Sequence, residues 1–344
     1  MSRRPTLHDV AKQAGVSIKT VSRVVNGIET VNADLRARVE AAVAELGYVP
    51  NTFARSLKSG TVDTIGVVVD SIADPFFSAL ANAIEERALL AGLNVIIGST
   101  GFVPERERRQ VERMAMQRVD GLVLAPVTGD HAYLESYRST FPIVLVDRTV
   151  ERDGYDLVAV ADRQLTRDAI QHLIDHGHRR IAFVGSDERF PTTTERLAGY
   201  HEAMASARIA VDPAWVRPGP TAERDAERAV HDLLVHDDAP TAIFAANPRA
   251  GAGVVHTLHT TGRQDIAFIS FGDFPLARTL TPAVTFVDQD PVAIGLAAIE
   301  RVLTHLDAAK RRAADPEVEI PEDEPRTLIV GTTLVTRGSG EVRA

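Results

Sequence analysis

The sequence of 344 residues contains no cysteine. This absence excludes disulfide frameworks, thiolate metal sites and cysteine nucleophiles. No apolar run approaches the roughly 18–20 residues that a membrane-spanning helix requires. The first residues, 1–5, are basic but lead into a polar helical pattern, so no secretory signal is expected. With 44% hydrophobic and 25% charged residues, the composition indicates a soluble, cytoplasmic protein of two or three domains and no membrane partner.

Several enzyme motifs are also missing. The first expected strand is followed by Asp70 and Ser71 instead of a Gly-x-Gly-x-x-Gly turn, which argues against a dinucleotide cofactor. There is no Walker-type lysine loop and no Gly-x-Ser-x-Gly nucleophile elbow. His172, His176 and His178 have a spacing that zinc could use, but such histidines are more often surface or helix-end residues. We therefore predict a protein that is not an enzyme and has no cofactor and no metal.

The negative charge is unevenly distributed. The whole chain has a net charge of −9, yet residues 1–60 contain nine Lys and Arg against five acidic residues, a charge of +4 that leaves −13 for the rest. A small basic segment on an acidic body indicates that only this segment meets a polyanion. Chance clustering would give a similar charge, so the motifs must decide.

Residues 6–26 have the pattern of two short helices joined by a tight turn. Thr6 can cap the first helix, Gly15 can end it, and Ser17 can cap the second. Apolar residues on one face of each helix can pack together, namely Val10, Ala11, Ala14, Val21, Val24 and Val25. This spacing predicts a helix-turn-helix. A helical hairpin used for protein contact is the alternative.

The outward face of the second helix carries side chains suited to DNA. In a helix-turn-helix this helix enters the major groove and its first residues reach base edges. Lys19 and Arg23 can donate to guanine O6 and N7. Short polar side chains suit phosphates, which fix the register without reading sequence: Thr6, Ser17, Ser22 and Asn26.

A third helix, expected over residues 32–46, completes a small core with Val39, Val43 and Leu46. Residues 50–60 then form a helix of barely two turns, which is too short to be stable alone in water. On this basic segment Leu57 would be an exposed apolar side chain, which suits insertion into the minor groove. An ordinary linker is the alternative.

Four motifs of this head have a specific resemblance: residues 6–11, 14–17, 20–26 and 46–51. They resemble the LacI/GalR family of bacterial transcription regulators, and the similarity continues nearly to the C-terminus. The resemblance implies a homodimer on a pseudo-palindromic double-stranded DNA operator, with paired hinge helices in the central minor groove. By this resemblance the base-reading positions are Ile18, Lys19, Ser22 and Arg23, Leu57 is the wedge, and Asn51 and Arg55 are further DNA contacts.

From Thr64 onwards, short apolar runs alternate with amphipathic helical stretches, which is typical of α/β architecture with parallel sheets. Two similar halves meet near residue 160 and resemble the periplasmic-binding-protein fold, which the family also implies. We expect strands at Ile65–Val69, Val95–Gly98, Leu122–Leu124, Ile143–Val146, Leu157–Val160, Ile181–Val184, Ala242–Ala245, Ile266–Phe271 and Val284–Val287.

The predicted organisation is an all-α helix-turn-helix head at residues 1–49, a hinge at 50–60 and a two-lobed α/β body at 61–344 for effector binding and dimerisation. The predicted function is a sequence-specific transcription regulator, a repressor, controlled by a small-molecule effector. A solute receptor of a transporter is the rival interpretation of the body, and the DNA-binding head argues against it.

In open α/β sheets, ligands bind beyond the carboxyl ends of the strands. The residues at those ends are the candidate effector contacts: Asp70, Phe76, Asp147, Phe190, Thr192, Arg196, Asn247, Asp273 and Gln289. Charged and amide groups beside aromatic faces suit a polyhydroxylated ligand such as a sugar. The family motif places Arg196 there. Helix capping is the alternative role for several of the others, since Asn247 precedes a proline.

Two positions depart from the family pattern. Pro248 follows Asn247 where an acidic residue is usual, and Gly272 stands where another acid is often found, with Asp273 one position later. Because both positions belong to the expected cleft, the effector cannot be copied from a relative. A sugar, a nucleoside or another polar metabolite remains open.

Overall fold

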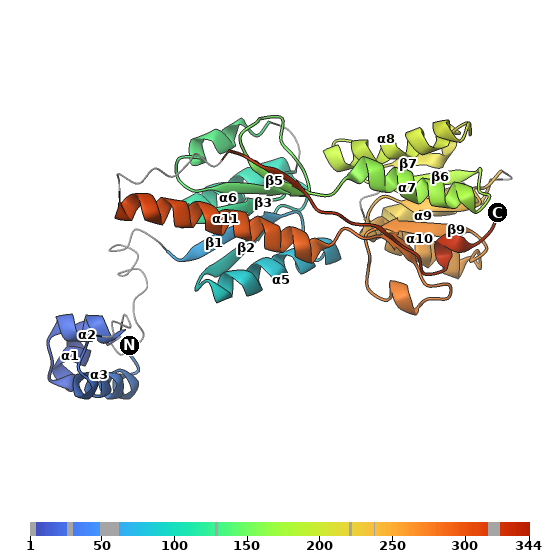
Figure 1. Cartoon of the computed structure of the whole chain (residues 1–344). Coiled ribbons are helices and arrows are strands. Elements are labelled where there is room, and N and C mark those ends of the chain that lie inside the picture. The colour runs from blue at the N-terminus through green and yellow to red at the C-terminus, as the bar shows by residue number, and fades with distance from the viewer. Residues whose placement is uncertain are drawn as a thin grey trace. The chain divides into compact units, whose positions relative to one another are not determined.

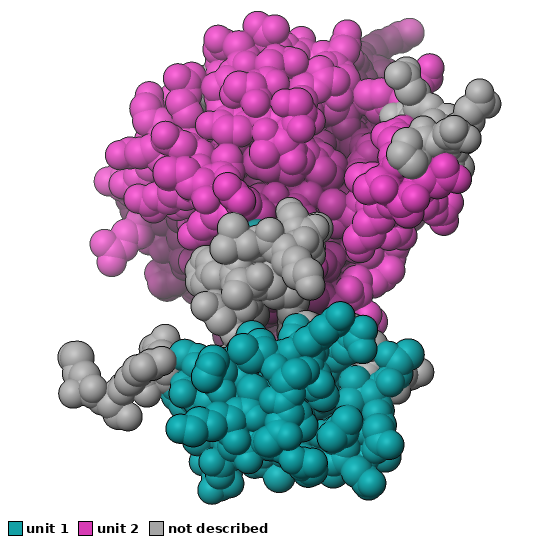
Figure 2. Space-filling view, turned by 90° about the vertical axis from the view of Figure 1, so that its left-hand side faces the viewer, with its two compact units in different colours: residues 1–62 teal, residues 63–344 magenta. Residues whose placement is uncertain are grey.

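The computed structural model describes residues 5–25, 30–48, 62–127, 130–219, 222–236, 238–315 and 324–344. The chain divides into two compact units, residues 1–62 and 63–344, which Figure 2 shows in different colours. The predicted boundaries of the hinge, at residues 49/50 and 60/61, lie outside the described residues, so the hinge stays a prediction.

The first unit contains the three predicted helices, α1 (Leu7–Ala14), α2 (Ile18–Val25) and α3 (Ala33–Leu46). Gly15 ends α1 with a φ of +63°, a conformation that glycine adopts without strain. Arg38 of α3 donates to the carbonyls of Ala14 and Gly15 at 2.5 and 3.1 Å, and a Cβ at Gly15 would lie 2.7 Å from its Nη2. The three helices enclose a small core: Val10, Ala11, Ala14, Val21, Val24, Val39, Ala42 and Tyr48.

The second unit has two lobes, each built on a six-stranded sheet (Figure 1). In the first lobe the strand order is β11-β5-β4-β3-β1-β2, all parallel. Every residue of β1 is buried, as expected of a central strand covered by helices on both faces. The strands are β1 (Thr64–Val69), β2 (Asn94–Ser99), β3 (Gly121–Leu124), β4 (Ile143–Val146), β5 (Asp156–Ala159) and β11 (Thr327–Ile329). The helices of this lobe are α5 (Pro75–Leu90), α6 (Pro104–Met116) and α11 (Pro291–Ala314).

The second lobe repeats this plan with the order β12-β10-β9-β8-β6-β7, in which only the pairing of β12 with β10 is antiparallel. The strands are β6 (Ile181–Gly185), β7 (Val216–Pro218), β8 (Ala242–Ala245), β9 (Ala267–Phe271), β10 (Thr285–Val287) and β12 (Leu334–Val335). The helices are α7 (Asp162–Asp175), α8 (Pro191–Ser206), α9 (Glu223–Leu234) and α10 (Pro248–Thr260).

The chain passes between the lobes after β5, after β10 and after β11 (Figure 1). All nine predicted strands are present within one or two residues of their expected bounds. The strands β7, β11 and β12 were not predicted, because each is only two or three residues long and lies at or next to polar or proline residues that interrupt an apolar run. The predicted all-α head and two-lobed α/β body with parallel sheets are confirmed.

Candidate nucleic-acid interface and ligand cleft

The helix α2 presents the predicted base-reading residues on its outer face. Ile18 has 47% of its surface exposed, and Lys19 and Arg23 are exposed as well. On the opposite face, Val21 and Val24 are buried in the core. Neither Lys19 nor Arg23 forms a hydrogen bond or an ion pair with another described residue, so both cations are available to a partner outside the unit.

The short polar residues of the head have local roles as well. The Thr6 hydroxyl accepts from the Asp9 backbone N–H at 3.4 Å and forms a capping box with the Asp9 carboxylate. Ser17 accepts from the Thr20 N–H at 3.1 Å. Ser22 is half-buried on α2. Four predicted DNA contacts, Asn26, Asn51, Arg55 and Leu57, lie outside the described residues.

A cleft of the second unit brings most of the predicted effector contacts together around a cavity of about 50 Å³. Seven of the nine line it: Phe76, Asp147, Phe190, Thr192, Arg196, Asn247 and Gln289. They come from both lobes, because the carboxyl ends of the two sheets face the same space. A neighbouring cavity of about 300 Å³ shares Phe76, Pro248 and Gln289 with it and is also lined by Asp273.

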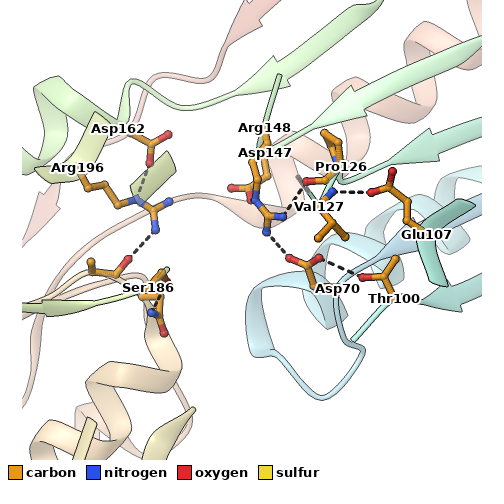
Figure 3. Close-up of polar contacts among 12 residues, drawn as sticks. Asp70, Thr100, Glu107, Pro126, Val127, Asp147, Arg148, Asp162, Ser186 and Arg196 are labelled. Carbon is orange, nitrogen blue, oxygen red and sulfur yellow. Dashed lines mark hydrogen bonds and ion pairs between the residues drawn. The ribbon is translucent and has the colours of Figure 1, made fainter. Parts of the chain in front are cut away.

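Arg148 forms the main charge cluster on the first-lobe side (Figure 3). Its guanidinium pairs with Asp70, lies 3.0 Å from the Asp147 carboxylate and donates to the Pro126 carbonyl at 2.8 Å. Burial alone would lower the pKa of Arg148, but the two carboxylates raise it above its ordinary value. Burial also raises the pKa of Asp70, and Arg148 opposes that rise. The arginine is therefore charged and held in a fixed orientation.

Arg196 forms a corresponding cluster on the second-lobe side (Figure 3). Its Nε donates to Asp162 and its Nη1 to the Ala246 carbonyl, both at 2.6 Å. The guanidinium lies 3.8 Å from the centre of the Phe271 ring. Burial raises the pKa of Asp162 to about 6, although Arg196 lowers it. Each lobe thus brings one buried arginine to the cavity and holds it with a buried carboxylate.

Contacts between rings and cations join the lobes across the cleft. Arg148 of the first lobe lies 4.6 Å from the ring centre of Phe190 of the second. Phe102, which follows β2, meets Phe190 edge-on with 5.9 Å between ring centres. Arg249 of α10 lies 5.7 Å from the centre of the Phe102 ring. These side chains fill the space between the lobes, which explains the small volume of the cavity.

Two predicted contacts lie away from the small cavity. Asp70 is fully buried behind Arg148 and accepts a hydrogen bond from Thr100 at 3.2 Å. Asp273 lines only the neighbouring cavity and pairs with Arg337 at 3.0 Å.

Among the other lining residues, Asp74, Phe77 and Arg148 belong to the strand-end segments of the predicted contacts, and Pro248 stands at a position expected in the cleft. Phe102, Ser186 and Arg249 were not predicted. Phe102 and Ser186 follow β2 and β6, so the rule of strand ends could have identified them. Arg249 lies in the first turn of α10 and had no comparable signal.

Asp74 caps α5 by accepting from the Phe76 N–H at 3.0 Å. Burial raises the pKa of Asp74 to about 6, and Arg249 partly opposes this rise. A carboxyl whose pKa is raised by folding destabilises the folded state once the pH exceeds its unfolded value, so its contribution to stability falls between about pH 4 and 6.

Asp74→Asn keeps a good helix cap and removes the buried charge. We expect it to raise the free energy of unfolding by about 2 kcal/mol at pH 7.5. This value is the pKa shift of Asp74 converted at about 1.4 kcal/mol per pKa unit, reduced by the stability lost because asparagine caps the helix less well. The gain should shrink as the pH falls from 6 towards 4. Urea unfolding across this range measures it. The matched control is Asp212→Asn, since Asp212 is exposed and accepts from the Ala214 N–H in the same way. A gain that does not change with pH would contradict the assigned cause.

The three histidines that raised the question of zinc have separate partners. His172 contacts Glu341 at 2.7 Å, His176 contacts the His172 carbonyl at 2.8 Å, and His178 contacts the Val342 carbonyl at 2.8 Å. Within the described ranges no group of three or more His, Asp or Glu side chains could hold a metal ion. In the same part of the chain no helix has the length and apolar character needed to cross a membrane.

Two family models match this chain. Residues 62–305 match the model described as periplasmic binding proteins and sugar binding domain of LacI family. Residues 6–51 match the model described as bacterial regulatory proteins, lacI family. The second match lies in the first compact unit, and the first match covers most of the second.

Among characterised relatives, the HTH-type transcriptional repressor PurR of Haemophilus influenzae is 31% identical over 312 residues, which cover 88% of this chain and 92% of the relative. Catabolite control protein A of Priestia megaterium is 33% identical over 305 residues, 87% of this chain and 91% of the relative. Among solved structures, a Lac repressor dimer bound to operator and the anti-inducer ONPF has a TM-score of 0.84 at 26% identity, with 99% of this chain and 100% of that chain covered. The transcriptional regulator CelR in complex with cellobiose has a TM-score of 0.69 at 28% identity, with 98% and 100% covered.

Proposed function

The chain belongs to the LacI family of bacterial regulatory proteins and is an effector-controlled transcription regulator that binds DNA, and from this premise we propose that it is a homodimeric repressor of a pseudo-palindromic operator. The observation that carries the proposal is the exposed face of α2, where Ile18, Lys19 and Arg23 have no partner inside the described part of the chain. Repression is supported by the repressor PurR among its relatives.

The base-reading role follows from the geometry of α2. Its apolar face is fixed in the three-helix core, so the helix presents Ile18, Lys19 and Arg23 as one rigid surface. Lys19 and Arg23 read guanines in the major groove, while the Ile18 side chain contacts thymine methyl groups. Ser17 and Ser22 contact phosphates and fix the register of the helix in the groove.

Exposed apolar side chains on the first lobe support the homodimer. Leu89 and Leu90, at the end of α5, have 72% and 83% of their surfaces exposed. Ile97 of β2 is 41% exposed, and β2 is the edge strand of its sheet. Apolar side chains gathered at an edge are typical of a surface that another chain covers. In the dimer they would be buried against a second copy of this surface.

The cleft is the effector site in this proposal. Its cavity of about 50 Å³ is far smaller than the roughly 300–1,000 Å³ of typical ligand sites. An effector must therefore separate Arg148 from Phe190 and Phe102 from Arg249, which changes the angle between the lobes. The effector can shift DNA affinity only as far as it binds one lobe arrangement better than the other. Polar groups from both lobes suit a polyhydroxylated metabolite, and no enzymatic activity is assigned to them.

Selection of bound sequences from a random DNA pool, followed by a mobility shift at fixed salt, tests the DNA-binding proposal. We expect a palindrome whose half-sites lie about one helical turn apart. Arg23→Ala should weaken binding to that site by about 10- to 100-fold, because an arginine–guanine contact discriminates by about 1–3 kcal/mol, and should leave binding to unrelated DNA nearly unchanged.

Lys310→Ala is the matched control, since Lys310 is an exposed cation on α11 of the other unit. It should bind the selected site like the unmodified protein. An enriched site without two-fold symmetry would contradict the homodimer on a palindrome. Equal losses on specific and unrelated DNA for Arg23→Ala would contradict the base-reading role.

A further inference from the structure

We propose that the effector carries an anionic group, a carboxylate or a phosphate, and that Arg249 binds this group in the cleft. The inference rests on the proposed effector function of the cleft and adds the chemical class of the ligand. It follows from Arg249, an arginine of the cavity lining that forms no hydrogen bond or ion pair with another described residue.

Arg249 lines the small cavity from the first turn of α10 and is half-buried. Its guanidinium lies 5.7 Å from the centre of the Phe102 ring. Among the described residues it forms no hydrogen bond and no ion pair. A guanidinium presents five N–H donors in a planar fork that matches a carboxylate or a phosphate. All five remain available to a ligand that enters beside Phe102.

The other two arginines of the cavity are already paired. Arg148 is held by Asp70 and Asp147, and Arg196 is held by Asp162. Arg148 thus has two carboxylates in contact and Arg196 has one, so these two residues orient polar groups of a ligand without calling for a further anion. Arg249 differs, because closing the cleft removes water from a cation with no carboxylate in contact, which is costly.

Asp74 interacts electrostatically with Arg249, because the charge of Arg249 lowers the pKa of the Asp74 carboxyl. The two form no ion pair, and the Asp74 carboxylate instead caps α5 through the Phe76 N–H. Asp74 is therefore committed to its helix and leaves Arg249 open. The charge of the Asp74 carboxylate would repel an anion. The anionic group of the effector must therefore bind on the side of the Arg249 guanidinium that faces away from Asp74.

Two further groups around the cavity can bind an anionic or hydroxylated ligand. Gln289 lines the cavity with only 4% of its surface exposed, and its amide makes no hydrogen bond to another described residue. The helix α8, which lines the cavity through Phe190 and Thr192, begins without a side-chain cap. The dipole of such a helix end favours negative charge.

The experiment is a binding screen of the full chain by thermal shift and calorimetry at one fixed ionic strength. The probes are matched sets: aldoses, their aldonates and uronates, their phosphates, and nucleosides with their monophosphates. We expect anionic members to bind and their uncharged partners to bind at least about 10-fold more weakly, because a charge-assisted hydrogen bond contributes about 1.5–3 kcal/mol. The set that binds also separates a carboxylate from a phosphate.

Arg249→Gln should weaken binding of the anionic ligand by about 10- to 100-fold and leave binding of its uncharged partner compound unchanged. Arg249→Lys keeps the positive charge but not the planar guanidinium, so its affinity for the anionic ligand should fall less than that of Arg249→Gln. Arg167→Gln, at an exposed arginine of α7 outside the cavity lining, is the control and should not change binding. Binding of uncharged compounds alone, or equal affinity of Arg249→Gln for the anion, overturns this inference while the effector site stands. No binding by any probe contradicts the effector site itself, and the inference with it.

Discussion

Arg148→Met is expected to lower the free energy of unfolding by about 3–5 kcal/mol at neutral pH, the cost of removing one partner of a buried ion pair. The substitution leaves the Asp70 carboxylate, which is fully buried, without its guanidinium. It also removes the donor to the Pro126 carbonyl. Urea unfolding followed by circular dichroism measures the loss.

The pH dependence of this loss has a defined sign. Burial already raises the pKa of Asp70, and Arg148 opposes that rise, so the variant raises the pKa further. A carboxyl with a raised pKa in the folded state takes up its proton more readily there than in the unfolded chain. The loss of unfolding free energy in Arg148→Met should therefore shrink as the pH falls. The double variant Arg148→Met/Asp70→Asn removes the unpaired charge and should recover most of the stability.

Arg138→Met is the matched control, because Arg138 is 42% exposed in its ion pair with Glu135. An exposed pair contributes about 0–1 kcal/mol. A similar small loss for Arg148→Met, or no recovery in the double variant, would mean that the Asp70–Arg148 pair does not support the lobe.

The fold could be predicted from the sequence because its signals are local. The caps Thr6 and Ser17 and the turn at Gly15 identify the head, and apolar runs of three to six residues identify nine strands. The segment Ala132–Tyr137 forms a 3₁₀ helix, and no periodic pattern of useful length marks it in the sequence. The edge strands β11 and β12 depend on pairing with distant residues, such as Ile329 with Ala159, which a local pattern does not contain.

The site could be predicted only in part for a related reason. The rule of strand ends locates residues along one lobe, and it placed seven of nine candidates at one cavity. It does not tell which side chains at a strand end face the cleft. Asp70 follows β1 but lies behind Arg148, because the guanidinium reaches it from the end of β4. Arg249 enters from a helix, and its contact with Phe102 of the opposite lobe depends on how the lobes meet.

Each lobe holds one buried arginine at the cavity by a carboxylate behind it. The ion pairs that orient these arginines are therefore distinct from the contacts that hold the two lobes together across the cleft. The pairs Arg148–Asp70 and Arg196–Asp162 keep their cations oriented whether or not a ligand is present, which reduces the ordering cost of binding. The contacts across the cleft are instead ring contacts between Arg148, Phe102 and Phe190. Such contacts are each worth about 0.5–2 kcal/mol, so a ligand can replace them.

Arg196→Met should abolish the response of DNA binding to the effector, once the screen has identified one, while DNA affinity without effector stays within about two-fold. Arg196 is the buried charged donor that the second lobe brings to the cavity. Truncating a buried charge in contact with a ligand costs about 2–5 kcal/mol, or roughly 30- to several thousand-fold in affinity. The head is a separate compact unit, so its DNA contacts are unaffected.

Since Arg196→Met leaves Asp162 unpaired, Arg196→Met/Asp162→Asn provides a folded protein for the same assay. Arg163→Met, at an arginine of α7 that is 48% exposed, is the control. A normal effector response in the Arg196 variants would show that the effector binds elsewhere, and loss of DNA binding without effector would show that Arg196 instead supports the fold on which the head depends.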